Sequence, residues 1–295
     1  MSANSAATTT RAAVVATNRH YDLPPEVFAT FLGERMKYTC GLYQETTAGL
    51  DQAQEAKLRF IAECLGIRSG QRVLDIGVGW GSLAFFLAQE HGCEVVGVTP
   101  SAMQARFVRE QARARGCAER VVVREVSVYD LEPPAGEFDA VAMVGVIEHM
   151  PDHHKALDIA ARALRRDGRL YVSASCYRGR RQQMEYEGRA SSRHVAETIF
   201  GYASLRPVSD LVAAIEDTGL SLSGLTDLTS HYHQTIEAWL GGVRASRTCI
   251  DALVPGLSAE LVRYLETTNS AWGYTAKHYA LTAIRSRWGR TEVPA

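Results

Sequence analysis

The sequence predicts an α/β fold built on a mostly parallel sheet of seven strands, and three observations support that prediction. Short apolar runs of strand length alternate with longer stretches of helical periodicity. One junction, Val73–Gly81, joins a buried strand to a helix through a turn of alternating glycines. The 295 residues, 46% of them hydrophobic, are enough for one sizeable core. Such alternation gives right-handed crossovers and places ligands beyond the carboxyl ends of the strands.

The N-terminal part is expected to cap this sheet with helices. Residues 1–18 are small and polar and predict a disordered tail, with no apolar run of signal-peptide length. The rest, residues 19–295, is expected to be a single domain whose first part, 19–68, is the helical cap. The elements expected there are a helix opened by Pro24 and Pro25 and running to about Leu32, an aromatic-rich loop over Met36–Tyr43, and a helix over Gly49–Leu65.

The central part alternates strand and helix in a regular order. The predicted strands are Val73–Ile76, Glu94–Val98, Val121–Val126, Phe138–Val144 and Leu170–Ser175. The predicted helices between them are Ser82–Glu90, Ser101–Arg115 with Ser101 as its N-cap, and Asp152–Arg166 ended by Gly168.

The regular alternation breaks after the fifth strand. Residues 176–205 are polar and arginine-rich, and we expect a lid inserted into the fold. Arginine guanidinium groups can bind an anionic substrate through paired hydrogen bonds. The acids Glu185 and Glu187 are equally consistent with a solvated loop. Beyond the insertion the predicted elements are a helix over Val208–Thr218, a strand over Leu220–Leu228, helices over Tyr232–Val243 and Ser258–Thr268, and a last strand over Tyr274–Ile284.

The glycine turn points to a particular ligand. A dinucleotide-binding turn, G-x-G-x-x-G/A, would need its third small residue where Ser82 stands, and that match fails. The sequence from Asp75 to Gly81 has the pattern D-x-G-x-G-x-G, which is typical of the S-adenosylmethionine (AdoMet) loop of Rossmann-like methyltransferases. Gly77 and Gly79 would let the backbone approach the ligand closely. The alternative is a structural turn in another kind of α/β protein.

Composition excludes several function classes. The formal net charge is -1, so nothing global indicates nucleic acid or an anionic membrane as a partner. The six cysteines are scattered without a C-x-x-C pair, which argues against zinc and against a disulfide framework. We expect no metal, no stable membrane insertion, a cytoplasmic location and a small-molecule substrate. The sequence leaves the oligomeric state open.

Several stretches together resemble the family of cyclopropane-fatty-acid synthases and mycolic acid cyclopropane synthases. The resemblance covers most of the chain, from His20 to about Ile284. The matching pieces are His20–Leu23 with Phe28, Tyr38–Cys40, Leu74–Gly81, Val96–Ser101 with Gln104, Ile147–Met150, and His231–Tyr232 with Trp239. It implies a Rossmann-like class I methyltransferase fold with AdoMet as cofactor. The same branch contains methyltransferases that act on alkaloid nitrogens and on the carbon chain of geranyl diphosphate.

The resemblance assigns cofactor contacts residue by residue. Gln104 would bind the ribose in place of the acid common after the second strand of such folds, and Asp75 would orient the loop or the methionine ammonium. An exposed helix position is the alternative for Gln104, and core packing is the alternative for Tyr38 and Trp80. The implied cofactor-binding residues are Tyr38, Thr39, Asp75, Gly77, Gly79, Trp80, Thr99, Pro100, Gln104, Ser127 and Val128.

The implied catalytic residues are Glu148, His149, Tyr232 and Cys40. Glu148 follows the fourth strand, where a carboxylate can accept a proton or bind an amine. In the cyclopropane synthases, groups matching Cys40, Glu148 and Tyr232 hold a bicarbonate together with a histidine on the fifth strand. Ser173 stands at that histidine's position, so we expect little dependence on bicarbonate and simple methyl transfer.

The function predicted from the sequence is methyl transfer from AdoMet to a small, apolar natural-product or lipid-like acceptor, on carbon or nitrogen. One alternative is a cyclopropane-forming enzyme that delivers a methylene to an alkene. Another is a non-catalytic AdoMet-binding partner protein.

Overall fold

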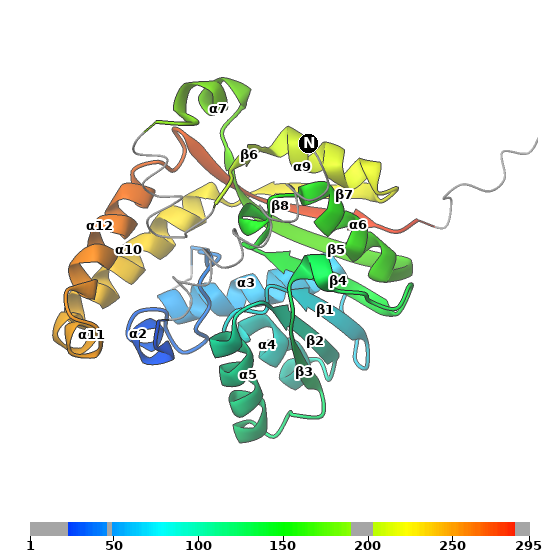
Figure 1. Ribbon diagram of the computed structural model, residues 1–295, viewed down its shortest axis with the longest axis horizontal. Helices are drawn as coiled ribbons and strands as arrows, with labels where there is room; N and C mark the ends of the chain where they lie inside the picture. The colour runs from blue at the N-terminus through cyan, green and yellow to red at the C-terminus, as the bar shows by residue number, and fades with distance from the viewer. Residues whose placement is uncertain (1–22, 46–48, 190–202, 287–295) are drawn as a thin grey trace, which may run out of the picture.

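The computed structural model describes residues 23–45, 49–189 and 203–286 (Figure 1). The tail predicted over residues 1–18, and much of the predicted lid, lie outside this described part.

The sheet has the strand order β3-β2-β1-β4-β5-β8-β7, with the short β6 paired to β5. The first five strands run parallel, and β8 is antiparallel to both β5 and β7. The predicted mostly parallel sheet of seven strands is therefore confirmed, with β6 as a small addition. The strands are β1 (Arg72–Ile76), β2 (Glu94–Thr99), β3 (Val121–Glu125), β4 (Phe138–Val144), β5 (Leu164–Tyr177), β6 (Arg206–Pro207), β7 (Ser221–Asp227) and β8 (Ala276–Ile284).

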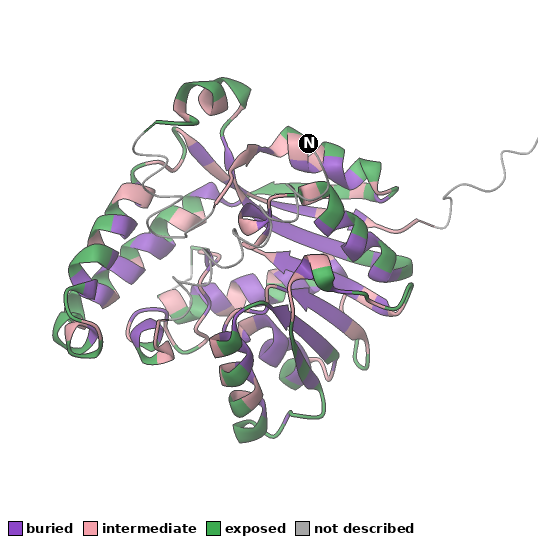
Figure 2. Ribbon diagram, in the orientation of Figure 1, coloured by how far each residue is buried: buried purple, intermediate pink, exposed green. Residues whose placement is uncertain are grey.

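Helices cover both faces of the sheet. One face packs against α3 (Leu50–Leu65), α4 (Ser82–Glu90) and α5 (Ala102–Ala114), and the other packs against α6 (His153–Ala163) and α9 (Val208–Asp217). Because strand side chains alternate between faces, Val73 lies in the first of these cores and Leu74 in the second. The sheet strands are mostly buried, whereas the helices expose their outer sides (Figure 2).

A separate helical cluster lies at one end of the sheet. It consists of α2 (Pro25–Ala29), α10 (Thr229–Ala245), α11 (Arg247–Leu253) and α12 (Leu257–Asn269), seen at the left of Figure 1. Phe28, Trp239 and Leu261 belong to its buried core, which also takes in Trp80 from the glycine turn. The glycine turn is thus attached to the helices at this end of the sheet. The sequence did not predict α11.

The fifth strand differs from its prediction at both ends. It begins at Leu164, so the helix expected to continue to Arg166 ends at Ala163. Asp167 has a positive φ of 62°, and the β4–β5 register shifts there. The first residues of β5 therefore pair irregularly with β4. The strand also continues to Tyr177, where Cys176 pairs with Arg206. Cys176 is therefore part of the sheet, and the prediction that the insertion begins there was wrong.

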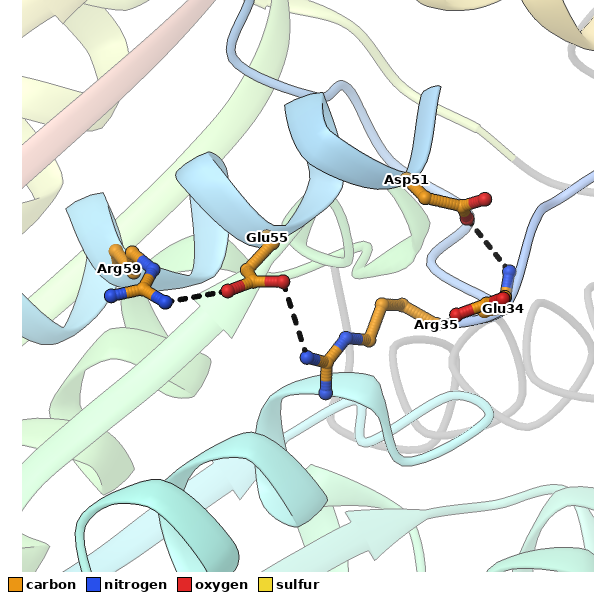
Figure 3. Close-up of polar contacts among 5 residues, drawn as sticks. All are labelled: Glu34, Arg35, Asp51, Glu55 and Arg59. Carbon is orange, nitrogen blue, oxygen red and sulfur yellow. Dashed lines mark hydrogen bonds and ion pairs between the residues drawn. The ribbon is translucent and has the colours of Figure 1, made fainter. Parts of the chain in front are cut away.

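The loop after α2 is fixed to α3 by polar contacts (Figure 3). Asp51 Oδ1 accepts the Glu34 backbone N–H at 2.8 Å. Glu55 accepts from Arg35 at 3.4 Å and from Arg59 at 2.5 Å. These contacts hold the segment that leads into Lys37 and Tyr38, two residues that line the site described next.

Candidate active site

The glycine turn has the backbone geometry that its sequence predicted. Gly77 and Gly79 have φ values of +83° and +54°, in the region that favours glycine. A Cβ at Gly77 would lie 2.4 Å from the Val146 side chain, so no larger residue fits there. A Cβ at Gly79 would meet only the Gly77 carbonyl oxygen, at 4.0 Å. The backbone of Gly79 therefore borders open space rather than protein.

That space is a cavity of about 140 Å³ at the carboxyl ends of β1, β2 and β4. Every residue predicted to bind the cofactor lines it: Tyr38, Thr39, Asp75, Gly77, Gly79, Trp80, Thr99, Pro100, Gln104, Ser127 and Val128. The lining also includes His149, which was predicted as a catalytic residue, and side chains to which the sequence assigned no role, among them Lys37, Tyr129 and Met150.

Hydrogen bonds fix the part of the cavity beyond β2. Thr99 Oγ1 donates to Gln104 Oε1 at 2.8 Å, and the Ser101 N–H donates to Thr99 Oγ1 at 3.2 Å. Ser101 caps α5 as predicted, accepting the Gln104 N–H at 3.2 Å. Gln104 is 6% exposed, so the alternative of an exposed helix residue was wrong. Ser127 accepts the Tyr129 N–H at 3.3 Å and begins a short 3-10 turn beside the cavity.

Tyr38 and Trp80 combine two roles that the sequence left as alternatives. Both line the cavity, and both pack in the helical cluster. The Trp80 ring lies 5.0 Å from Phe28 and 5.2 Å from Phe107, centroid to centroid. The Tyr38 ring lies 5.2 Å from that of Trp239. Core packing therefore holds these rings in place at the cavity wall.

Two opposite charges are buried at the same cavity. Lys37 is 3% exposed and Asp75 is 2% exposed. Burial, and then the nearby Lys57 ammonium, lower the pKa of Lys37 to about 7. Burial raises the pKa of Asp75 to about 7, against the opposing effect of the Lys37 ammonium. No sequence signal marks Lys37, because a lone lysine in a loop is ordinarily a surface residue.

A second cavity of about 360 Å³ adjoins the first. Tyr38, Gly145 and His149 line both. Glu148 lines the second and is 7% exposed, with its Oε1 accepting the Ser175 N–H at 2.5 Å. Its Oε2 is buried and accepts no hydrogen bond from the described residues. Burial raises the pKa of this carboxyl group.

Aromatic side chains dominate the second cavity. Tyr232 stacks on Trp272, with ring centroids 4.5 Å apart, and meets Trp239 edge-on at 6.2 Å. The remaining aromatic lining comes from Tyr38, Tyr177, Tyr186 and Tyr264. The sequence identified Tyr232 but not Tyr177, Tyr264 or Trp272. Tyr177 lies on β5, whereas Tyr264 lies on α12 and Trp272 just after it, so no local pattern joins them to Tyr232.

Cys40 is the predicted catalytic residue that lines neither cavity. It is fully buried, and Lys57 Nζ donates to its Sγ at 3.2 Å. Ser173, the strand-five residue, is also fully buried, and its Oγ has no partner among the described residues. An imidazole is nevertheless close by on β8. His278 Nδ1 lies 3.4 Å from Ser175 Oγ, and the His278 ring lies 4.8 Å from that of Tyr232.

The arginine-rich segment is only partly described. Its described part includes α7 (Arg180–Tyr186). Arg180 pairs with Asp210 at 2.5 Å, and Arg189 pairs with Glu185 at 3.3 Å, all near the surface. Tyr186 is the α7 residue that lines the second cavity. These contacts favour a solvated role over an anion-binding one for Arg180 and Arg189.

Neither a metal-ligand cluster nor a membrane-spanning helix is found among the described residues. No group of three or more His, Cys, Asp or Glu side chains there is arranged to hold a metal ion. No described helix is both long enough and apolar enough to span a bilayer.

Comparison with known proteins gives one family. The model of the mycolic acid cyclopropane synthetase family matches residues 8–278. A probable fatty acid methyltransferase of Pseudomonas putida is 30% identical over 241 residues, which are 80% of this chain and 60% of that protein. A probable (S)-tetrahydroprotoberberine N-methyltransferase of Papaver bracteatum is 28% identical over 251 residues, 82% of this chain and 67% of that protein.

Solved structures give the same fold. The mycolic acid cyclopropane synthase CmaA1, complexed with SAH (S-adenosylhomocysteine) and CTAB, superposes with a TM-score of 0.84 at 22% identity, covering 92% of this chain and 98% of that one. The class I methyltransferase fold is therefore established. The chain spans about half to two thirds of the length of the curated relatives it matches.

Proposed function

Because the chain belongs to the mycolic acid cyclopropane synthetase family, we propose that it transfers a methyl group from AdoMet to a small, largely apolar acceptor. The cofactor would occupy the first cavity and the acceptor the second. The observation that supports this most directly is that the two cavities adjoin at Tyr38, Gly145 and His149. Methyl transfer needs donor and acceptor aligned at such a junction, since positioning lowers the barrier by several kcal/mol.

The first cavity fits AdoMet on grounds independent of the relatives. Its wall includes the backbone of Gly79, where a Cβ would project into open space. Polar groups of Thr99 and Gln104 lie where a ribose could bind, and aromatic faces of Tyr38 and Trp80 lie where a cation could rest. When bound, AdoMet supplies a methyl group on a cationic sulfur.

Glu148 is the proposed proton acceptor at the acceptor cavity. Its Oε1 is held by the Ser175 N–H, so the unpartnered Oε2 is the atom that would take the proton. Its raised pKa makes it a stronger base than an ordinary carboxylate. Tyr232 and His149 would orient the acceptor from the cavity wall. The surrounding rings would stabilise positive charge that develops on the acceptor.

Turnover and binding together test this function. Calorimetric titration with S-adenosylhomocysteine should show one site per chain. Incubation with AdoMet and separate alkene and amine acceptors should then give a product heavier by one CH2. Cofactor binding without turnover over a broad acceptor panel would favour the non-catalytic alternative, and absence of binding would refute the proposal.

Cyclopropane formation is a second candidate, and one observation favours it. Ser173 cannot replace the histidine that holds bicarbonate in cyclopropane synthases, but His278 brings an imidazole to the Tyr232 ring from the neighbouring strand. We still expect simple methyl transfer with little bicarbonate dependence. Product NMR and turnover in bicarbonate-depleted buffer separate the two candidates. Upfield cyclopropane protons, or activity that collapses without bicarbonate, would make ring formation the function.

A further inference from the structure

One buried hydroxyl joins the segment that walls the first cavity to the helix that walls the second. The segment is residues 37–43, whose Tyr38 and Thr39 line the first cavity. The helix is α10, whose Tyr232 lines the second. Thr235 lies on α10, is fully buried and lines neither cavity. Its side chain is therefore placed to connect the two walls without touching either ligand.

The Thr235 hydroxyl makes a hydrogen bond on each side. Its Oγ1 accepts the Gly41 N–H at 2.9 Å and donates to the His231 carbonyl oxygen at 2.7 Å. A second contact lies beside it, in which the Tyr43 N–H donates to His231 Nδ1 at 3.2 Å. The segment is thus joined to α10 at two points. Both lie in the helical turn that carries Tyr232.

The opposite side of the segment is held by α3. Gln54 Nε2 donates to the Lys37 carbonyl oxygen at 3.2 Å, and the Leu42 N–H donates to the Ala53 carbonyl oxygen at 2.7 Å. A Cβ at Gly41 would lie 2.8 Å from Ala53 Cβ, so the backbone approaches α3 closely there. The segment is therefore clamped between α3 and α10, and Thr235 supplies the contact on the α10 side.

Helix packing alone does not explain a threonine at position 235. Its neighbours on the buried side of α10 include Ile236 and Trp239. Valine has nearly the same shape and would bury no polar group in such surroundings. A threonine hydroxyl bonded to the carbonyl of the preceding turn also slightly destabilises a helix. What the hydroxyl provides is an acceptor for the Gly41 N–H, which valine would leave unpaired.

We propose that Thr235 is a positioning residue that sets the wall of the acceptor cavity relative to the wall of the cofactor cavity. This inference rests on the proposed function, because it presumes that donor and acceptor occupy the two cavities. Tyr38 and Thr39 belong to the segment and Tyr232 to α10, so the hydrogen bond holds their relative positions across the junction. Methyl transfer depends on that alignment, since a misplacement of about 1 Å can cost roughly 100-fold in rate.

Hydrogen exchange of the full chain, with and without S-adenosylhomocysteine, tests the link without an acceptor. In wild type the ligand should protect residues 37–43 and, through Thr235, the first turns of α10. Thr235→Val keeps the side-chain shape but removes the hydroxyl. The protection that α10 gains should then fall by roughly half or more, with the remainder carried by the contact between the Tyr38 and Trp239 rings. Affinity for S-adenosylhomocysteine should stay within about threefold of wild type.

Turnover measures the consequence for the reaction. The probes are oleic acid as the alkene and N-methylbenzylamine as the amine, each with saturating AdoMet. Thr235→Val should lower kcat by roughly 10–100-fold, with the KM for AdoMet nearly unchanged. Thr235→Ser keeps the hydroxyl and should restore most of the lost rate. Thr235→Ala replaces the valine variant if that variant does not fold, as thermal unfolding will show.

Val243→Ala is the matched control. It shortens another fully buried side chain of α10 that lines neither cavity, so it should lower thermal stability while kcat stays near wild type. A loss of kcat in this variant equal to that in Thr235→Val, at equal loss of stability, would make Thr235 merely structural.

The outcomes separate this inference from the proposed function. If wild type binds S-adenosylhomocysteine but α10 gains no protection, or gains as much in Thr235→Val as in wild type, the link is wrong and the proposed function stands. This exchange measurement decides the link even if wild type converts neither probe. If wild type does not bind S-adenosylhomocysteine at all, both proposals fail.

Discussion

The two adjoining cavities are built in different ways. Much of the first comes from short local stretches, since the glycine turn follows β1 directly, Thr99 ends β2, and Pro100 and Gln104 follow it within a few residues. The second gathers side chains from η2 (Ile147–His149), β5, α10, α12 and the start of β8. The backbone geometry of the first is set by local sequence, whereas that of the second depends on how distant helices pack.

This difference suggests that the two cavities serve separate functions. A cavity made by turns at the strand ends is rigid, because the buried strands β1 and β2 carry it. A cavity walled by α10 and α12 can change through substitutions on those helices without disturbing the sheet. We therefore expect the first cavity to fix the cofactor and the second to determine the acceptor. Substitutions in one cavity should therefore disable that cavity and leave the other intact.

The largest expected effect is at Gly79. Gly79→Val places a branched side chain in the open space beside the turn, where the cofactor would lie. Because most contacts between the ligand and the turn would be lost, S-adenosylhomocysteine affinity should fall by about 100-fold or more. Gly70→Val is the matched control. Gly70 has a φ of +77° and its Cβ would also meet open space, but it does not line the cavity.

Both glycine variants should show a similar loss of thermal stability, because each forces a branched residue into a left-handed conformation. The titration then isolates the steric effect on the ligand. Wild-type affinity in a folded Gly79→Val protein would refute the assignment of the first cavity to AdoMet.

The next effect concerns the second cavity. Glu148→Gln keeps an oxygen that can accept the Ser175 N–H but removes the proton acceptor. We expect turnover to fall by roughly 100- to 10,000-fold, the usual contribution of a general base, with S-adenosylhomocysteine affinity nearly unchanged. Equal losses in turnover and in cofactor affinity would make Glu148 a structural residue.

The pH profile sharpens the same test. Burial raises the pKa of Glu148, and only the ionised form accepts a proton. Turnover should therefore rise with pH through a midpoint above the ordinary range of glutamate. The Gln variant should lack this rise, and a wild-type profile that is flat through this range would exclude Glu148 as the base.

The contrast between the cavities also explains what could be predicted from the sequence. The glycine turn and Ser101 have local signatures, and so do the alternating strands, because their geometry depends on neighbouring residues. Tyr264 and Trp272 have no such signature, since they reach the second cavity through the packing of α12, and of the turn that follows it, near α10. Lys37 was missed for a different reason: its burial follows from the path of a loop, which periodicity does not reveal.

A smaller effect should follow from the buried acid of the first cavity. Burial raises the pKa of Asp75 to about 7, so the native state keeps a proton that the unfolded chain releases near pH 4. The free energy of unfolding contributed by Asp75 should therefore decline from about pH 4 to pH 7 and stay low above it. Lys37 is protonated in both states over most of that window, so the decline isolates Asp75.

Asp75→Asn should flatten this decline. Between pH 4 and pH 7, the free energy of unfolding of wild type should fall by roughly 1–4 kcal/mol more than that of the variant. Denaturant unfolding at a series of pH values measures the difference. A parallel decline in both proteins would mean that another group is responsible.

The smallest effect is expected where neither cavity is touched. Glu55 bridges Arg35 and Arg59 on the surface of α3, and the Arg59 guanidinium is the main cause of its lowered pKa. Glu55→Gln should cost about 0–1 kcal/mol of unfolding free energy, the usual value of exposed ion pairs, and the cost should shrink in high salt.

The Asp51 contact to Glu34 would still hold the loop before Lys37. Affinity for S-adenosylhomocysteine should therefore stay within about twofold of wild type, well under the tenfold that corresponds to 1.4 kcal/mol. A large loss of affinity would show that the first cavity depends on the helical cap as well as on the turns, which would remove the contrast between the two cavities.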